Sequence, residues 1–152
     1  MLVAESHRGR TLLLRLDRKD LLHDRILAVC RERGVRCARV TGLGAFEEAE
    51  LVEYDQAKKV YKPAQSFRAA MELLSLQGNV SEKDGQPFIH LHAAVSRERE
   101  DQARRVEVLG GHLNRAVVFA AEITLDCYDD LRLHRLPDEP TGLSLWGRCE
   151  EG

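Results

Sequence analysis

The chain has 152 residues, of which 43% are hydrophobic and 32% are charged. This length and composition predict one globular domain with a packed core and exclude an intrinsically disordered chain. The formal net charge is −2, so the chain has no overall surplus of cations with which to neutralise nucleic-acid phosphates. No apolar stretch approaches the roughly 20 residues of a membrane-spanning helix, and we expect no membrane contact.

The cysteines lack the Cys-x-x-Cys spacing of redox and zinc motifs, and the first residues lack the apolar core of a secretion signal. We therefore expect a cytoplasmic protein with reduced thiols. The four cysteines are Cys30, Cys37, Cys127 and Cys149. Cys30 lies on the apolar side of a predicted helix and Cys127 ends an apolar run, so both are interpreted as packing residues.

The N-terminal part predicts a strand followed by a helix. Residues 11–16 form a short apolar run of strand length, and Asp17 after it can serve as a helix N-cap. Between residues 18 and 33, apolar side chains recur with the 3.6-residue period of an amphipathic helix. Gly34 stands where a C-cap glycine is expected, so the helix is predicted to end there.

Beyond Gly34 the pattern favours short strands joined by turns. Strands are predicted over residues 35–40, 51–54, 71–77, 88–95 and 116–125. Asp84-Gly85 predicts the tight turn of a hairpin. Residues 97–105 are expected to form an exposed charged loop, and residues 137–152 a flexible tail with a frayed end. Together these elements predict an α+β fold: a mostly antiparallel sheet of about seven strands with one main helix packed on one face.

Gly42 and Gly44 follow a predicted strand, as the glycines of a nucleotide-binding loop do. The third glycine of that motif, the helix after it and a P-loop lysine are all absent from the sequence. The two glycines are therefore interpreted as a turn with positive φ or a close approach between backbones.

Three histidines form the candidate site. His90 and His92 lie two residues apart in a predicted strand, so both point to the same face with Cβ atoms about 7 Å apart. His112 follows the Gly110-Gly111 pair, and a turn there can bring a third imidazole to the same place. Three imidazoles with an open fourth position suit zinc or another divalent metal. The alternative is that each histidine is a partly buried hydrogen-bonding residue. His7, His23 and His134 are interpreted as surface residues.

Metal-assisted catalysis would also need a general acid or base. Glu72 and Glu122 stand within apolar strands and are candidates for proton transfer or for holding a ligand histidine. The alternative is that both carboxylates face solvent. The sequence does not predict a reaction or a substrate, and whether the protein is an enzyme stays open.

These segments resemble the PPC (plants and prokaryotes conserved) domain. The resemblance extends from about Leu12 to Leu145, within a single domain of residues 1–152. It rests on the following segments: Gly42-Leu-Gly-Ala-Phe46, Tyr54-Asp55, Glu72-Leu-Leu-Ser-Leu-Gln-Gly-Asn79, Asp84-Gly85, His90-Leu-His92, Gly110-Gly-His-Leu113 and Asp138-Glu-Pro-Thr-Gly-Leu143. Prokaryotic members are often labelled PD1-like DNA-binding proteins.

The resemblance implies an antiparallel sheet of about seven strands with a packed helix, assembled as a homotrimer. It also implies that His90, His92 and His112 hold a metal ion, as in some prokaryotic members. Plant members join this domain to an AT-hook, an Arg-Gly-Arg-Pro element. Here Arg8-Gly9-Arg10 is followed by Thr11 and leads into an apolar strand, so we do not assign an AT-hook.

Three functions remain open at this point. The first is a DNA-binding or regulatory protein that acts as a homotrimer, although the net charge gives DNA binding no support. The second is a metal-dependent protein or enzyme that binds a small-molecule ligand at the three histidines. In the third, the histidines stabilise a trimer interface.

Overall fold

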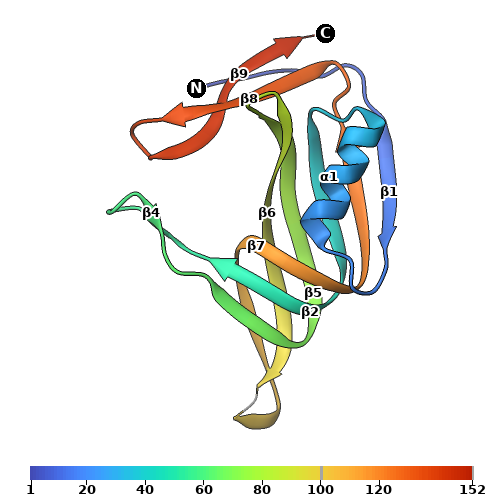
Figure 1. The fold of residues 1–152 in the computed structure, drawn as a ribbon, viewed down its shortest axis with the longest axis vertical. Coiled ribbons are helices and arrows are strands. Elements are labelled where there is room, and N and C mark those ends of the chain that lie inside the picture. Colours follow the sequence, from blue (N-terminus) through green and yellow to red (C-terminus); the bar gives the residue numbers. More distant parts are fainter. Residues whose placement is uncertain (100, 152) are drawn as a thin grey trace.

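The structure, a computed structural model, describes residues 1–99 and 101–151 and consists mainly of long strands (Figure 1). Its elements are β1 (Thr11–Leu16), α1 (Leu22–Arg33), β2 (Ala38–Val52), β3 (Tyr54–Asp55), β4 (Val60–Tyr61), β5 (Gln65–Lys83), β6 (Gln86–Arg99), β7 (Gln102–Cys127), β8 (Leu131–Asp138) and β9 (Leu143–Glu151). No helix of the described residues is long and apolar enough to cross a membrane.

Four strands close into a small barrel. β2 pairs with β5 and β7, and β6 pairs with the same two strands, all in antiparallel register. β1 extends the sheet at β7. β8 joins β5 through one parallel pair, Glu82 with His134, and β9 pairs with β8. A separate two-stranded ribbon is formed by β3 and β4.

The predicted mostly antiparallel sheet with one helix is confirmed, but the α+β class needs correction. The fold is mostly β, with a barrel and a single short helix (Figure 1). The prediction failed because long strands continue through glycines at which the sequence pattern placed turns. β2 continues through Gly42 and Gly44, and β7 continues through Gly110 and Gly111.

Gly42 and Gly44 mark a close approach between β2 and β7. The register of β2 against β5 shifts between these two glycines, as at a β-bulge. Gly44 has φ +150°, and a Cβ atom there would clash with the Ala120 carbonyl oxygen and lie 2.7 Å from Ala121 Cα. The close-approach interpretation is confirmed and the turn interpretation is wrong, because both glycines lie inside a strand.

Helix α1 covers the apolar interior. Leu22, Ile26 and Cys30 are buried and join the core formed by the barrel strands. The helix begins later than expected: its N-cap is Leu21, and Asp17 does not cap it. Lys19 has φ +73°, which interrupts the helical backbone before Leu21. Gly34 ends the helix in the left-handed conformation (φ +66°), as predicted.

Two segments expected to be irregular are paired strands. Around residues 97–105, β6 extends to Arg99 and β7 begins at Gln102, so most of the predicted loop is a hairpin. In the predicted tail, residues 143–151 form β9 along β8, with Leu131 paired to Glu151. Alternating apolar side chains are sparse in both segments, and the pairing is set by the neighbouring strand.

Other local predictions are confirmed. Asp84 (φ +52°) and Gly85 (φ +73°) both have positive φ, as in the tight hairpin turn that joins β5 and β6. Cys30 and Cys127 are buried packing residues, and all four cysteines are free. Burial is the main cause that raises the pKa of the Cys30 thiol to about 11.

We predict that Gly44→Ala destabilises the fold by about 2–4 kcal/mol, because the added methyl group has no room against β7. Gly85→Ala is the matched control, since Gly85 also has positive φ but has open space around it. That change should cost only about 1 kcal/mol. Urea unfolding of the two variants measures the difference, and equal losses would contradict the steric argument.

Candidate metal centre

The alternation of β6 places two histidines on one face. Ile89, Leu91 and Ala93 are buried in the core, so His90 and His92 between them point away from it. The prediction that these two side chains share a face is therefore confirmed.

β7 supplies the third histidine. His112 is the direct cross-strand partner of His92 and also pairs with Val52 of β2. It therefore lies where β7 passes from one neighbouring strand to another. Gly111, with φ +156°, precedes it at this point. Antiparallel partners point to the same face, so the register itself brings His112 to His92.

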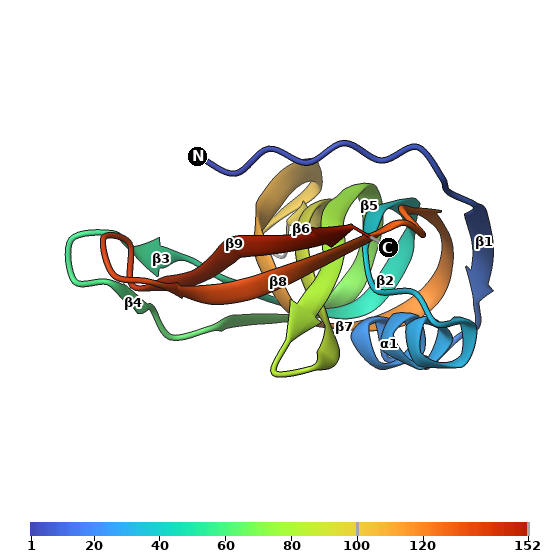
Figure 2. The same cartoon turned by 90° about the horizontal axis from the view of Figure 1, so that it is seen from above.

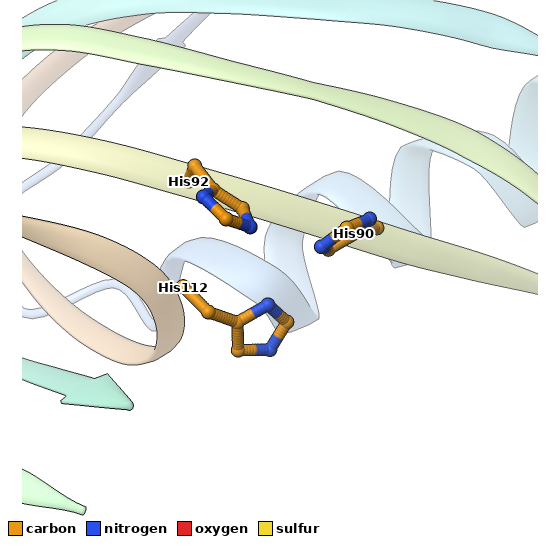
Figure 3. Close-up of side chains that lie close together, drawn as sticks. All are labelled: His90, His92 and His112. Atoms are coloured by element: carbon orange, nitrogen blue, oxygen red, sulfur yellow. The ribbon is translucent and has the colours of Figure 1, made fainter. Parts of the chain in front are cut away.

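The three imidazoles converge (Figure 3). The ring centroids of His90 and His92 are 5.0 Å apart, as are those of His90 and His112. Those of His92 and His112 are 5.5 Å apart. One ring nitrogen from each residue lies within 4.8 Å of the other two. The predicted set is thus brought together with the donor chemistry that a divalent metal requires.

The surroundings keep two of these rings neutral. Burial, followed by the effects of His112, Arg135 and His92, lowers the pKa of His90 to about 4. Burial also lowers the pKa of His112, assisted by His92. His112 Nδ1 is buried and has no hydrogen-bond partner among residues 1–99 and 101–151. Neutral imidazole is the form that binds metal, so the donors suit an ion at neutral pH.

A cleft of about 840 Å³ opens beside the histidines. Its walls include all three imidazoles, the β3–β4 ribbon and the β8–β9 turn, which both lie on the side away from α1 (Figure 2). The Tyr54 hydroxyl donates a hydrogen bond to the Thr141 carbonyl oxygen at 2.7 Å and joins ribbon to turn. Tyr61 lies against His112, with ring centroids 5.4 Å apart. The site therefore has space for a ligand.

A second cleft, of about 560 Å³, adjoins the first and contains a buried cation. Tyr61, His90 and His112 line both clefts, and Arg135 lines the second. Neither Arg135 nor Tyr61 belongs to the site residues predicted from the sequence. A signal for Arg135 does exist, because it follows Leu131 and Leu133 at alternating positions of β8 and shares their buried face.

The other sequence candidates lie elsewhere. Glu72, opposite Ala45 and Ser96, and Glu122, opposite Arg15 and Leu43, are exposed and line neither of the two clefts. The solvent-facing alternative is thus correct for both carboxylates.

Two of the histidines assigned to the surface are partly buried. The His23 ring bonds through Nε2 to the Leu113 carbonyl oxygen at 3.0 Å. The His134 ring lies 3.4 Å from a Glu150 carboxylate oxygen. His7 is exposed, as predicted.

Comparison with solved structures finds close similarity over nearly the whole chain. A metal-containing protein from Archaeoglobus fulgidus is 38% identical, with a TM-score of 0.88 over 97% of this chain and 100% of that chain. A plant- and prokaryote-conserved (PPC) protein from Pyrococcus horikoshii is 34% identical, with a TM-score of 0.84 over 97% and 98%. A "putative dna binding protein" from Bacteroides thetaiotaomicron is 26% identical, with a TM-score of 0.79 over 94% and 98%.

A comparison with curated proteins finds no match. The family model described as the Plants and Prokaryotes Conserved (PCC) domain matches residues 3–126, which include all three histidines. This is the family that the sequence motifs resemble under the abbreviation PPC. The chain belongs to the Plants and Prokaryotes Conserved domain family.

Proposed function

We propose that this protein binds one divalent metal ion, with zinc as the leading candidate, through His90, His92 and His112, and that the bound ion faces a small-molecule site. One observation carries the proposal: three imidazoles, each with a ring nitrogen within 4.8 Å of the other two, line a cleft of about 840 Å³. A protein 38% identical to this chain is described as metal-containing, which supports the same conclusion.

The chain's own residues would fix the ion and leave one side open. His90 and His92 are held by the pairing of β6 with β5, and His112 by the pairing of β7 with β6 and β2. A bound ion of this type supplies a Lewis acid that polarises an oxygen of its ligand. Tyr61 packs beside His112 and limits access from that side.

We propose ligand binding as the primary activity, rather than catalysis. Glu53 lines the larger cleft, but its carboxylate accepts a 2.7 Å hydrogen bond from Lys62 Nζ, which lowers the pKa of Glu53. Glu72 and Glu122 do not line this cleft. None of these three carboxylates is placed as a free base beside the histidines.

DNA binding is the function in the names of two relatives, each at 26% identity. The net charge of −2 supplies no cation surplus for phosphate contacts, and salt-dependent phosphate contacts dominate nonspecific DNA binding. We therefore propose a role that does not depend on DNA. Tight binding to duplex DNA that weakens as salt rises would overturn this choice.

We also propose that the chain assembles as a homotrimer, as its family resemblance implies. Support comes from Val106 and Val108, which are 67% and 64% exposed on β7. They alternate with Glu107 and Leu109, which are half-buried, and share the face of His112. Neighbouring exposed apolar side chains on one strand face are the kind of surface that another protein covers.

For the metal site, we predict one zinc ion per chain in purified, untagged protein. Replacing any one of His90, His92 or His112 by alanine should weaken zinc binding at least about 100-fold, because even the loss of a residue that only orients a ligand costs 10–100-fold. Equilibrium dialysis with elemental analysis measures this. His7→Ala, at an exposed histidine outside the cluster, is the control and should bind like the wild type. A wild-type protein that zinc, manganese and iron all fail to load would refute the proposal.

For pH dependence, we predict that the metal-free protein loses stability as the pH falls from 7 toward 4. The unfolded chain protonates His90 near its ordinary pKa of 6.5, whereas the folded protein does so only at about 4. Between these values the unfolded state binds more protons, so acid favours unfolding. Urea unfolding at pH 7 and pH 5, after chelator treatment, measures the change. His90→Asn should reduce the pH dependence and His7→Asn should leave it unchanged; the reverse order would contradict the assignment.

For assembly, we predict that light scattering after size-exclusion chromatography gives a trimer for the wild type and a monomer for the Val106→Asp, Val108→Asp double variant. Burying two carboxylates in an interface is costly, so the assembly should dissociate. Val60→Asp changes an exposed valine on the β3–β4 ribbon and should remain trimeric. A monomeric wild type would refute the proposal, and a trimer that persists in chelator would show that assembly does not need the metal.

A further inference from the structure

We propose that the second cleft, of about 560 Å³, binds a small molecule through a carboxylate group, and that Arg135 is the residue that pairs with this carboxylate. The inference deepens the proposed function and rests on it, because it names the chemical class of the ligand that would reach the metal.

Arg135 is a buried cation with neutral partners. Its residue is only 9% exposed, and its guanidinium lies over the Phe88 ring at 4.9 Å from the centroid. Nε donates to Ser81 Oγ at 2.8 Å, Nη1 to the Ser144 carbonyl oxygen at 2.7 Å, and Nη2 to Asn79 Oδ1 at 2.9 Å. Within residues 1–99 and 101–151, no carboxylate forms an ion pair with it.

A buried charge without a counter-charge is costly, and proteins normally pair such groups. An arginine has five N–H donors, and these three bonds use one donor on each nitrogen. Each terminal nitrogen therefore keeps one further N–H. Two such donors from one planar guanidinium match the two oxygens of a carboxylate. An anionic ligand would supply the missing counter-charge.

The β-sheet register places Arg135 beside the histidine cluster. Asn79, which accepts a hydrogen bond from Arg135, is the direct cross-strand partner of His90. Arg135, His90 and His112 line the same cleft of about 560 Å³, a volume typical of small-molecule sites. A ligand that binds Arg135 in this cleft therefore lies beside His90 and His112, two of the three proposed metal ligands.

The charge count favours a carboxylate over a phosphate group. Among the side chains that line the cleft, Arg135 is the one buried cation; Lys83 is exposed and its Nζ lies over the same Phe88 ring, 5.7 Å from the centroid. No helix N-terminus lines the cleft, and the helix α1 is not part of its walls. Phosphate sites in proteins normally use several cations or a row of backbone N–H groups. A single guanidinium is sufficient for a carboxylate.

The test is calorimetric titration of zinc-loaded protein with acetate, malonate, succinate and glutarate, and with acetamide and inorganic phosphate for comparison. The three dicarboxylates differ in length, so one of them should span the distance between Arg135 and the metal. We expect at least one dicarboxylate to bind about tenfold more tightly than acetate, and acetamide not to bind. Arg135→Lys should weaken the tightest dicarboxylate at least about tenfold, because lysine keeps the charge and loses the two-pronged hydrogen bond.

Lys83→Met is the matched control, since Lys83 lines the same cleft but is exposed. It should change dicarboxylate binding less than threefold; a loss equal to that of Arg135→Lys would mean nonspecific attraction by positive charge and would overturn the inference. The inference would also be overturned by tighter binding of phosphate, by an unchanged affinity in Arg135→Lys, or by the absence of dicarboxylate binding to the wild type.

If Arg135→Lys does not fold, Ser81→Ala removes one acceptor that orients the guanidinium. A shift of the Arg135 Nε–H resonance on adding the dicarboxylate to wild-type protein is then the deciding signal.

Zinc binding measured on the same samples separates the two proposals. Arg135→Lys should load zinc like the wild type, because Arg135 contributes no metal ligand. If the wild type takes up no metal, the proposed function fails. Dicarboxylate binding to the metal-free protein that still depends on Arg135 would then support the arginine site alone, and its absence would refute that site too.

Discussion

The site depends on one constraint of backbone pairing: β7 changes its neighbouring strand at residue 112. Before that residue it pairs with β6, and after it with β2, so His112 is in register with both His92 and Val52. This exchange of partners closes the barrel. It also brings His112 of β7 beside His90 and His92 of β6. Closing the barrel in this register therefore assembles the histidine cluster.

Several polar side chains around the histidine cluster are costly to bury. His90 and His112 are held neutral mainly by loss of solvent, and Arg135 is a buried cation without a carboxylate partner within the described part of the chain. A stable core gains nothing from such groups, because apolar side chains of the same size would pack there at lower cost. Clustering of perturbed titratable groups in a cleft is characteristic of a functional site. The side chains that are costly to bury are therefore the same side chains that line the candidate site.

Part of this arrangement is predictable from the sequence. The two-residue spacing places His90 and His92 on one face in any strand, and Asp84-Gly85 specifies its hairpin through local backbone preference. The convergence of His112 depends on long-range register, which no local pattern encodes, and its inclusion rested on the Gly-Gly-His motif and the family resemblance. The alternation of Leu131, Leu133 and Arg135 signals that Arg135 is buried, but its place beside the histidines follows only from the pairing of β8 with β5.

Two different parts of the fold form the walls of the 840 Å³ cleft. The wall that carries the histidines consists of barrel strands whose register is fixed by many backbone pairs. The opposite wall consists of the β3–β4 ribbon and the β8–β9 turn, which are joined by the Tyr54–Thr141 hydrogen bond. Changes in the length or sequence of these two hairpins therefore leave the spacing of the histidines intact. Within this fold, the walls that would contact a ligand can therefore vary without moving the three histidines.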